Sequence, residues 1–162
     1  MSSSIKLLTQ TFNEAELGEN YEIVDNGFGG KLAKLYNKNV RIAIGIQPTW
    51  AISLDAFYKI EGASKGIARC SLLWLLKKLL TEKLITEEEI MKVSSPTPND
   101  GNMGRLIGIY EDIGFTLGEP EPGNPVNLSS TIQNLIETLE KQCAFTSVHC
   151  AHFPPQLTNL RF

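Results

Sequence analysis

The sequence predicts a single α/β domain with a mixed central sheet, antiparallel at its start, and helices on both faces. Three stretches between turn residues are predicted to be strands: residues 31–36, 40–46 and 51–60, and the second of them alternates apolar residues with smaller or charged ones. Residues 67–81 instead repeat leucine at helical spacing, so a long helix follows the third strand. A further strand at 90–95 and a helix that carries Met103 continue the alternation, which favours an α/β sheet.

Length and composition fit one soluble globular domain. The 162 residues are 42% hydrophobic and 20% charged, and the formal net charge is −3. This charge gives no support to a nucleic-acid partner, because such proteins carry basic patches. No apolar stretch is long enough to cross a membrane, and the first residues lack the apolar core of a secretory signal. The three cysteines are an odd number, so we expect no disulfide framework and an intracellular, cytoplasmic setting.

Turn residues delimit the first strands. Asn37-Lys38-Asn39 lies between two of them and has the chemistry of a hairpin turn. In the strand that follows, apolar residues alternate with smaller or charged ones: Val40, Ile42, Ile44 and Ile46. An earlier strand is expected at Tyr21–Val24, and a short helix or strand at Ile5–Phe12.

The helix at 67–81 has the strongest pattern. One wide arc of its surface is apolar, as in a helix that lies on a sheet: Ala68, Leu72, Leu73, Leu75, Leu76, Leu79 and Leu80. The opposite arc holds Ser71, Trp74, Lys77 and Lys78. We therefore expect Trp74 to be partly exposed between lysines.

Prolines, glycines and capping residues set the later boundaries. Pro96 ends the strand at 90–95, and Asn99 or Asp100 can cap the next helix. Gly114 stands where a helix end needs a left-handed residue.

The C-terminal part is expected to hold one more helix and a strand. Ser129 or Ser130 is predicted to cap a helix that runs to about Cys143. A strand is expected at Phe145–Val148.

A glycine-bearing loop opens the leucine-rich helix. The first turn of a helix has unpaired backbone N–H groups and partial positive charge, so it binds phosphate oxygens when no bulky side chain intervenes. Gly66 and Ala68 allow that approach, and Lys65 and Arg69 can add charged hydrogen bonds. The segment Ser64–Ala68 is therefore a candidate phosphate site. The alternative is an ordinary strand-to-helix turn that needed a glycine.

The segment Ala63-Ser64-Lys65-Gly66-Ile67-Ala68 resembles the pyrophosphate-binding motif Gln/Arg-x-x-Gly-x-Gly/Ala of the GNAT superfamily of N-acetyltransferases. The Gly-x-Ala half matches, whereas Ala63 replaces the leading Gln or Arg. The resemblance covers about residues 51–115, where loop, helix, strand, helix and Gly-Phe follow the family's order. It implies that the coenzyme A pyrophosphate is held by backbone amides and two charged side chains: Ser64, Lys65, Gly66, Ile67, Ala68 and Arg69.

Tyr110, Gly114 and Phe115 match the family pattern Tyr-x-x-x-Gly-Phe. The resemblance implies that the Tyr110 phenol lies near the thioester sulfur and protonates the departing thiolate, since a phenol donates a proton without carrying a charge. The alternative is a core tyrosine at a helix end. Asn102 resembles the asparagine-bearing start of the same helix, where it either contacts the cofactor or caps the helix.

The strand at 51–60 resembles the family's fourth strand, which splays from the fifth and admits the pantetheine arm. The resemblance implies that backbone groups near Tyr58 and Ile60 hydrogen-bond this arm. The acceptor amine must lose a proton, and a carboxylate or a water chain usually takes it. Asp55 and Glu61, on or beside this strand, are the candidate bases.

We therefore expect an enzyme that transfers the acetyl group of acetyl-CoA directly to a primary amine in a ternary complex, without a metal. The alternative is a degenerate fold of this family that binds coenzyme A or a protein without catalysis. Ala63, and an N-terminal part too short for the family's usual pair of helices, would suit that alternative. The expected partners are acetyl-CoA and an amine acceptor, not nucleic acid or a membrane; a homodimer is compatible. The single domain comprises a cofactor half at about 51–115 and an atypical C-terminal helix and tail at 129–162.

Cysteine and histidine chemistry is the weaker reading of the sequence. Four residues near the C-terminus are zinc-type ligands, but their spacing matches no usual paired pattern: Cys143, His149, Cys150 and His152. A nucleophilic pair would need Cys70 or Cys150 beside a histidine, and no motif surrounds either cysteine. We expect buried thiols and no metal site.

Overall fold

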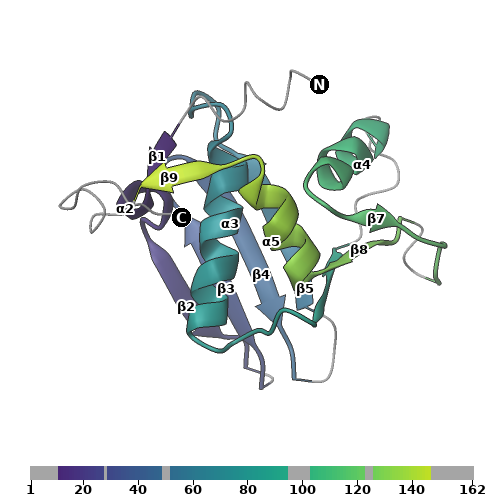
Figure 1. Cartoon of the computed structure of the whole chain (residues 1–162). Helices are drawn as coiled ribbons and strands as arrows, with labels where there is room; N and C mark the ends of the chain where they lie inside the picture. The colour runs from purple at the N-terminus through teal and green to yellow at the C-terminus, as the bar shows by residue number, and fades with distance from the viewer. Residues whose placement is uncertain (1–10, 28, 49–51, 95–102, 123–125, 147–162) are drawn as a thin grey trace.

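The computed structural model of the chain describes residues 11–27, 29–48, 52–94, 103–122 and 126–146 (Figure 1). The elements in chain order are β1 (Thr11–Asn13), α2 (Glu14–Leu17), β2 (Tyr21–Asp25), β3 (Lys31–Tyr36), β4 (Val40–Ile46), β5 (Ile52–Lys59), α3 (Ile67–Thr81), β6 (Ile90–Val93), α4 (Met103–Asp112), β7 (Thr116–Leu117), β8 (Leu128–Thr131), α5 (Ile132–Glu140) and β9 (Ala144–Thr146).

Seven strands form one mixed sheet in the order β2-β3-β4-β5-β6-β8-β7. Each neighbouring pair is antiparallel except β5 and β6, which run parallel and are connected by the crossover helix α3. β8 lies between β6 and β7, although it follows both in the chain. β1 and β9 form a separate parallel pair. The prediction of a mixed sheet that begins antiparallel is confirmed.

The four strands from β2 to β5 pair with their neighbours in chain order. Their register places alternate residues on one fully buried face: Ala33, Leu35, Ile42 and Ile44. Asn37 fixes the β3–β4 turn, because its side-chain carbonyl accepts hydrogen bonds from the backbone N–H groups of Asn39 (2.8 Å) and Val40 (3.1 Å). The opposite face carries exposed aromatic residues, among them Tyr36 and Tyr58.

The helix expected at residues 67–81 is confirmed as α3 with the same bounds. Its leucines form the centre of the core, as predicted: Leu72, Leu73, Leu75, Leu76 and Leu79. The predicted polar arc is only partly right, since Cys70 and Ser71 are also buried. α2 and α5 also pack against α3, so they bury part of its surface that the sheet does not reach.

Trp74 on α3 is half-buried, as predicted, and its ring meets Tyr21 on β2. A Cβ atom on Gly18 would come within 2.4 Å of the indole ring, so this position needs glycine. The Tyr21 ring meets Trp74 edge-on at 5.5 Å between centroids. The Tyr21 hydroxyl donates to the Glu82 carboxylate at 2.6 Å, which ties β2 to the end of α3.

The expectation of helices on both faces of the sheet is wrong for the described part of the chain. α3 and α5 lie side by side on one face (Figure 1). The end of α4 reaches the same face, because the Tyr110 ring lies against Phe57, which is paired with the buried Ile42. Over β3, β4 and β5 no described helix covers the other face. The cause is the short connection between β2 and β3, residues 26–30, which contains no helix.

The C-terminal part differs from the prediction in its boundaries. Ser129 and Ser130 lie in β8 and do not cap a helix. Thr131 is the cap of α5, since its side-chain oxygen accepts a hydrogen bond from the backbone N–H of Asn134 at 3.1 Å. The expected strand near Phe145 is present as β9, whereas β7 and β8 were not predicted. Of the segment expected at Ile5–Phe12, all but the last two residues lie outside the described part.

None of the described helices has the length and apolar character needed to cross a membrane.

We predict that Leu76→Ala destabilises the fold by about 2–5 kcal/mol, because the side chain is fully buried and its removal leaves a cavity. Leu80→Ala is the matched control on the same helix, since Leu80 is only partly buried and should cost clearly less. Urea unfolding followed by circular dichroism measures both losses. Equal losses for the two variants would contradict this assignment of the core.

Candidate functional site

Beyond Leu54, β5 has no strand partner on its β6 side among the described residues. β5 pairs with β4 along its length, up to Val40 opposite Lys59. Its parallel ladder with β6 covers only Ile52–Leu54, opposite Met91–Val93, and a backbone hydrogen bond from Ser94 to Leu54 (3.0 Å) follows it. Within the described residues, the rest of β5 therefore leaves backbone groups open toward β6. Such groups need a partner, and a bound extended ligand can supply one.

The first turn of α3 lies next to this open half. The cap residue Gly66 has a φ of 88° and no side chain, so no side-chain cap covers the N–H groups of Ala68 and Arg69. A Cβ atom on Gly62 or Gly66 would meet no atom within 4 Å, so open space borders both glycines. The Lys59 ammonium donates to the Ala63 carbonyl at 2.9 Å and ties the end of β5 to the loop. The first turn of α3 therefore has uncapped backbone N–H groups and open space beside its glycines.

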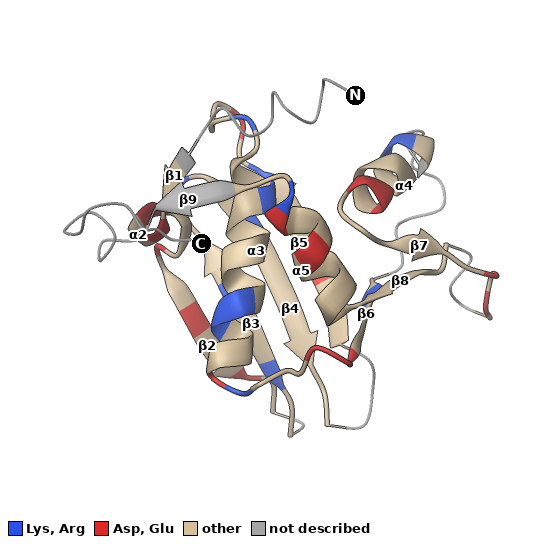
Figure 2. Cartoon of the chain, viewed as in Figure 1, with Lys and Arg blue, Asp and Glu red and all other residues tan. Residues whose placement is uncertain are grey.

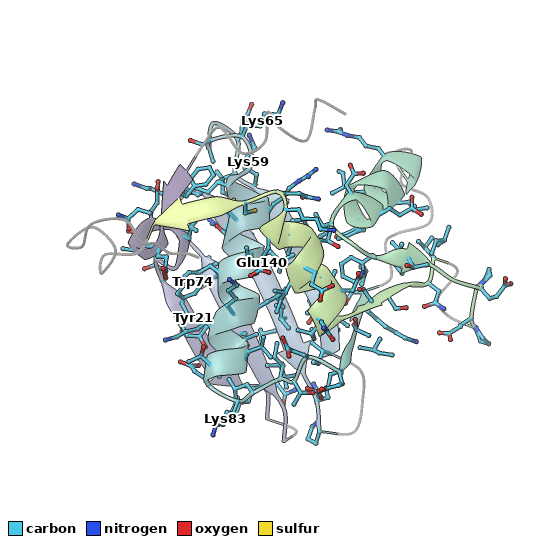
Figure 3. All side chains as sticks on the ribbon, viewed as in Figure 1. Tyr21, Lys59, Lys65, Trp74, Lys83 and Glu140 are labelled. Atoms are coloured by element: carbon cyan, nitrogen blue, oxygen red, sulfur yellow. The ribbon has the colours of Figure 1, made fainter. Side chains whose placement is uncertain are left out.

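Positive charge gathers at this end of the molecule. Figure 3 shows Lys59 and Lys65 together where α3 begins, and Lys83 at the far end of the same helix. Figure 2 shows basic positions around the same end, with the acidic Glu61 in the same loop. Lys65 is exposed and can reach an anion at the first turn of α3.

Arg69 has a different role from the one expected. Its guanidinium donates to the Gln142 side-chain carbonyl at 2.8 Å and lies 3.8 Å from the Asp112 carboxylate. Arg69 is therefore engaged with the end of α4 and with the residue after α5, whereas Lys65 is exposed beside the first turn of α3.

Tyr110 lies beside the open half of β5. Its ring centroid is 6.2 Å from that of Phe57 and 5.8 Å from that of Phe115, the latter edge-on. Burial raises the pKa of the Tyr110 hydroxyl above that of an ordinary phenol. The group is therefore a neutral proton donor at physiological pH. Both phenylalanines fix the ring by apolar contact.

Asp55 is the extra residue of a β-bulge. Ala43 pairs with Ala56 and Ile44 pairs with Leu54, so Asp55 has no partner on β4. Its carboxylate accepts a hydrogen bond from the Ser94 hydroxyl, which connects β5 to the residue after β6.

The Asp55 carboxylate also lies next to Gly45, which points away from the buried face of β4. Asp55 and Tyr110 therefore lie on opposite faces of the sheet, Asp55 bonded to Ser94 and Tyr110 packed against Phe57.

The remaining predicted residues are less well placed. Glu61 is exposed beyond the end of β5, and no contact joins it to Tyr110 within the described residues. The Ile60 N–H already donates to the Asn39 carbonyl at 2.8 Å, so it is not free for a ligand. The Tyr58 side chain is 57% exposed on the face opposite Phe57, and only its backbone lies at the gap. Asn102 lies outside the described residues.

Sequence reasoning missed three contacts. Phe57, Ser94 and Gln142 all touch predicted site residues, but none belongs to a local motif. Alternation along residues 51–60 could have placed Phe57 on the buried face. No local pattern predicts the contacts of Ser94 and Gln142, because their partners are 39 and 73 residues away in sequence.

Cys70 and Cys143 are both buried and their thiols share a hydrogen bond. This hydrogen bond, and then burial, raise the pKa of the Cys143 thiol. No histidine or carboxylate completes a metal-binding group among the described residues. His149, Cys150 and His152 lie outside them, so the zinc alternative concerns residues without a described position.

A shallow hollow of about 150 Å³ lies on the outer side of α3, away from the residues above. It is lined by Glu14, Trp74, Lys77, Lys78 and Thr81. Lys77 pairs with Glu140 at 2.8 Å and Lys78 with Glu82 at 3.3 Å. Both lysines of the hollow thus form ion pairs with carboxylates, and no predicted site residue lines the hollow.

Compared with known proteins, the chain matches no protein-family model, and no curated protein is significantly similar to it in sequence.

We predict that neither Cys70 nor Cys143 reacts with a thiol reagent in the folded protein, since both thiols are buried and the pKa of Cys143 is raised. The measurement is titration with a chromogenic disulfide in a Cys150→Ser variant, which leaves only these two thiols. Both should react once denaturant is added. Rapid reaction of either thiol in the folded variant would revive the nucleophile alternative.

Proposed function

We propose that the chain is an N-acetyltransferase that binds acetyl-CoA between β5 and β6 and transfers its acetyl group to a primary amine. One observation carries the proposal: the first turn of α3, the open half of β5 and Tyr110 lie together at one end of the sheet. Coenzyme A needs donors for its phosphates, a partner for its amide-bearing arm and a proton source at its sulfur. These three features supply them in that order.

The pyrophosphate would lie at the start of α3. The uncapped N–H groups of Ala68 and Arg69 and the positive end of the helix favour phosphate oxygens. Lys65 adds a charged donor from the loop. Because Arg69 is engaged with Gln142 and Ala63 has no polar group, these phosphate contacts would be fewer than the family motif implies.

The pantetheine arm would act as a short extra strand. Its two amides can hydrogen-bond the backbone of β5 beyond Leu54, where the β6 ladder has ended. The thioester would then lie near the level of Phe57, against which Tyr110 packs. Pairing with an extended ligand satisfies backbone groups that would otherwise face only solvent.

The chemistry assigns one proton to each face of the sheet. The amine nitrogen bonds to the thioester carbonyl carbon and the carbon–sulfur bond breaks, which leaves an amide and a thiolate. The thiolate takes the proton of the Tyr110 hydroxyl, whose phenolate is reprotonated by solvent. Asp55 accepts the proton released by the nitrogen from the other face. Asp55 suits this better than Glu61, because it stands on the strand itself.

The GNAT resemblance supports the proposal through the order of its elements. A mixed sheet contains a parallel pair with a crossover helix, and the glycine loop opens that helix. The chain departs from the family between β2 and β3, where residues 26–30 replace the usual helices. Those helices shape the acceptor pocket in the family, so the identity of the amine does not carry over.

A second candidate is a non-catalytic member of the same family that binds coenzyme A or a protein partner. Two observations favour it: the missing polar side chain at Ala63 and the engagement of Arg69 away from the phosphate turn. Binding of acetyl-CoA without turnover on a broad panel of amines would support this candidate. Absence of binding would leave a protein-interaction role.

We predict that the protein binds acetyl-CoA and free coenzyme A, and that Lys65→Ala weakens both by about 3- to 10-fold, as expected for one exposed charged contact. Lys83→Ala is the matched control, because Lys83 lies at the opposite end of α3 (Figure 3) and should not alter affinity. Calorimetric titration measures all three proteins. No heat and no thermal stabilisation at millimolar ligand would sink the proposal.

We predict that Tyr110→Phe lowers kcat by about 10²- to 10⁴-fold while the Kd for acetyl-CoA changes little, because only the proton donor is removed. Steady-state kinetics with the best acceptor amine from the panel provides the test, and thermal melting verifies the fold.

The pH profile gives an independent check. Since burial raises the pKa of Tyr110, the phenol stays protonated beyond the ordinary tyrosine pKa of about 10. Wild-type kcat should therefore show no alkaline loss from this group below about pH 10. Unchanged turnover of Tyr110→Phe across pH would exclude the assigned role.

A further inference from the structure

The end of α4 is held in place by polar contacts from the α5 segment. None of the side chains described for α4 is fully buried, and the first fully buried apolar residue, Ile113, comes directly after its last residue. We infer that Gln142, two residues after α5, is a positioning residue that holds the end of α4, and with it Tyr110, against α3. The catalytic role of Tyr110 in this inference rests on the proposed function. The position of Tyr110 does not depend on it.

Gln142 bridges two helices with its single amide group. Its side-chain carbonyl accepts a hydrogen bond from the Arg69 guanidinium of α3 at 2.8 Å. Its NH₂ group donates to the backbone carbonyl of Asp112, the last residue of α4, at 2.7 Å. The Asp112 carboxylate lies 3.8 Å from the same guanidinium, so Gln142, Arg69 and Asp112 all contact one another. One side chain thus satisfies an end carbonyl of α4 and anchors it to the first turn of α3.

The turn after α4 is held from the same side. The Asn134 amide donates to the Gly114 carbonyl at 2.8 Å. Gly114 has a φ of 120°, and a Cβ atom there would lie 3.1 Å from the Thr138 hydroxyl and 3.3 Å from Leu135, so the turn packs directly on α5. The Phe115 N–H in turn donates to the Tyr110 carbonyl at 3.1 Å. The two anchored carbonyls, those of Asp112 and Gly114, therefore follow closely after Tyr110 in the chain.

This arrangement leaves the Tyr110 ring little freedom. A shift of the α4 end away from α3 would separate the ring from Phe57, its contact on β5. The ring would then move away from the open half of β5. Gln142 touches neither the gap nor the proposed thioester, so its effect on Tyr110 passes through Asp112.

The test compares two Gln142 variants with a control glutamine on α5. Gln142→Ala removes both hydrogen bonds. Gln142→Glu keeps an acceptor for Arg69 but turns a second oxygen toward the Asp112 carbonyl, so only the anchor to α4 is lost. Gln133→Ala is the control, because the Gln133 side chain is exposed and bonds only Glu137 within its own helix, at 3.1 Å.

The readout is nuclear magnetic resonance of tyrosine- and phenylalanine-labelled protein, with the Tyr110 signals assigned by their loss in Tyr110→Phe. We expect the cross-peaks between the Tyr110 and Phe57 rings to be lost in both Gln142 variants and kept in Gln133→Ala, with all three chains folded by circular dichroism. Cross-peaks that persist in the Gln142 variants overturn the inference, whatever their activity. If Gln142→Ala fails to fold, Gln142→Glu alone decides.

Turnover separates this inference from the proposed function. Where the wild type acetylates an amine, both Gln142 variants should lose kcat by at least about 10-fold without a change in the Kd for acetyl-CoA. A wild type without any turnover contradicts the proposed function, but the cross-peaks still decide whether Gln142 holds Tyr110.

Discussion

The packing of α3 on the sheet is the interaction on which the rest of the structure depends. β5 and β6 share a ladder of only three residue pairs, which is too short to hold two strands by itself. The buried leucines of α3 share one core with Leu54 of β5 and with Met91 and Val93 of β6, and burying each leucine contributes roughly 1.5–3 kcal/mol. This shared core adds to the short ladder in joining the two strands. Beyond Leu54, β5 pairs with no described residue on the β6 side.

α5 gives the site its second support. The helix buries one apolar stripe against α3 and presents amide side chains toward the end of α4. The same face of the sheet thus carries the crossover helix, the helix end with Tyr110 and the segment that anchors it. On the opposite face the aromatic side chains of β3 and β5 stay in contact with solvent. The polar contacts that hold the end of α4 lie on one side of the sheet, and the Asp55 carboxylate lies on the other.

Local patterns predicted the elements that they determine. Alternation along residues 31–36 and 40–46, and the leucines of 67–81, gave strands and a helix with nearly correct bounds, because each pattern is complete within its own segment. The prediction of a helix cap at Ser129 or Ser130 is wrong. Serine favours helix caps, but long-range pairing with β6 places both residues in a strand. The glycine loop and Tyr110 were found by short motifs. The engagement of Arg69 and the contact between Cys70 and Cys143 depend on a segment more than 70 residues away, about which the local sequence is silent.

The position of β8 in the sheet affects how the chain folds during its synthesis. β8 follows β6 and β7 in the chain but lies between them in the sheet. During synthesis, β6 therefore keeps one bare edge until residues 128–131 leave the ribosome. A bare strand edge pairs readily with other extended segments. A nascent chain that has reached Leu117 contains the proposed cofactor half, yet it still lacks β8, which pairs with both β6 and β7, and α5, which contacts the turn after α4.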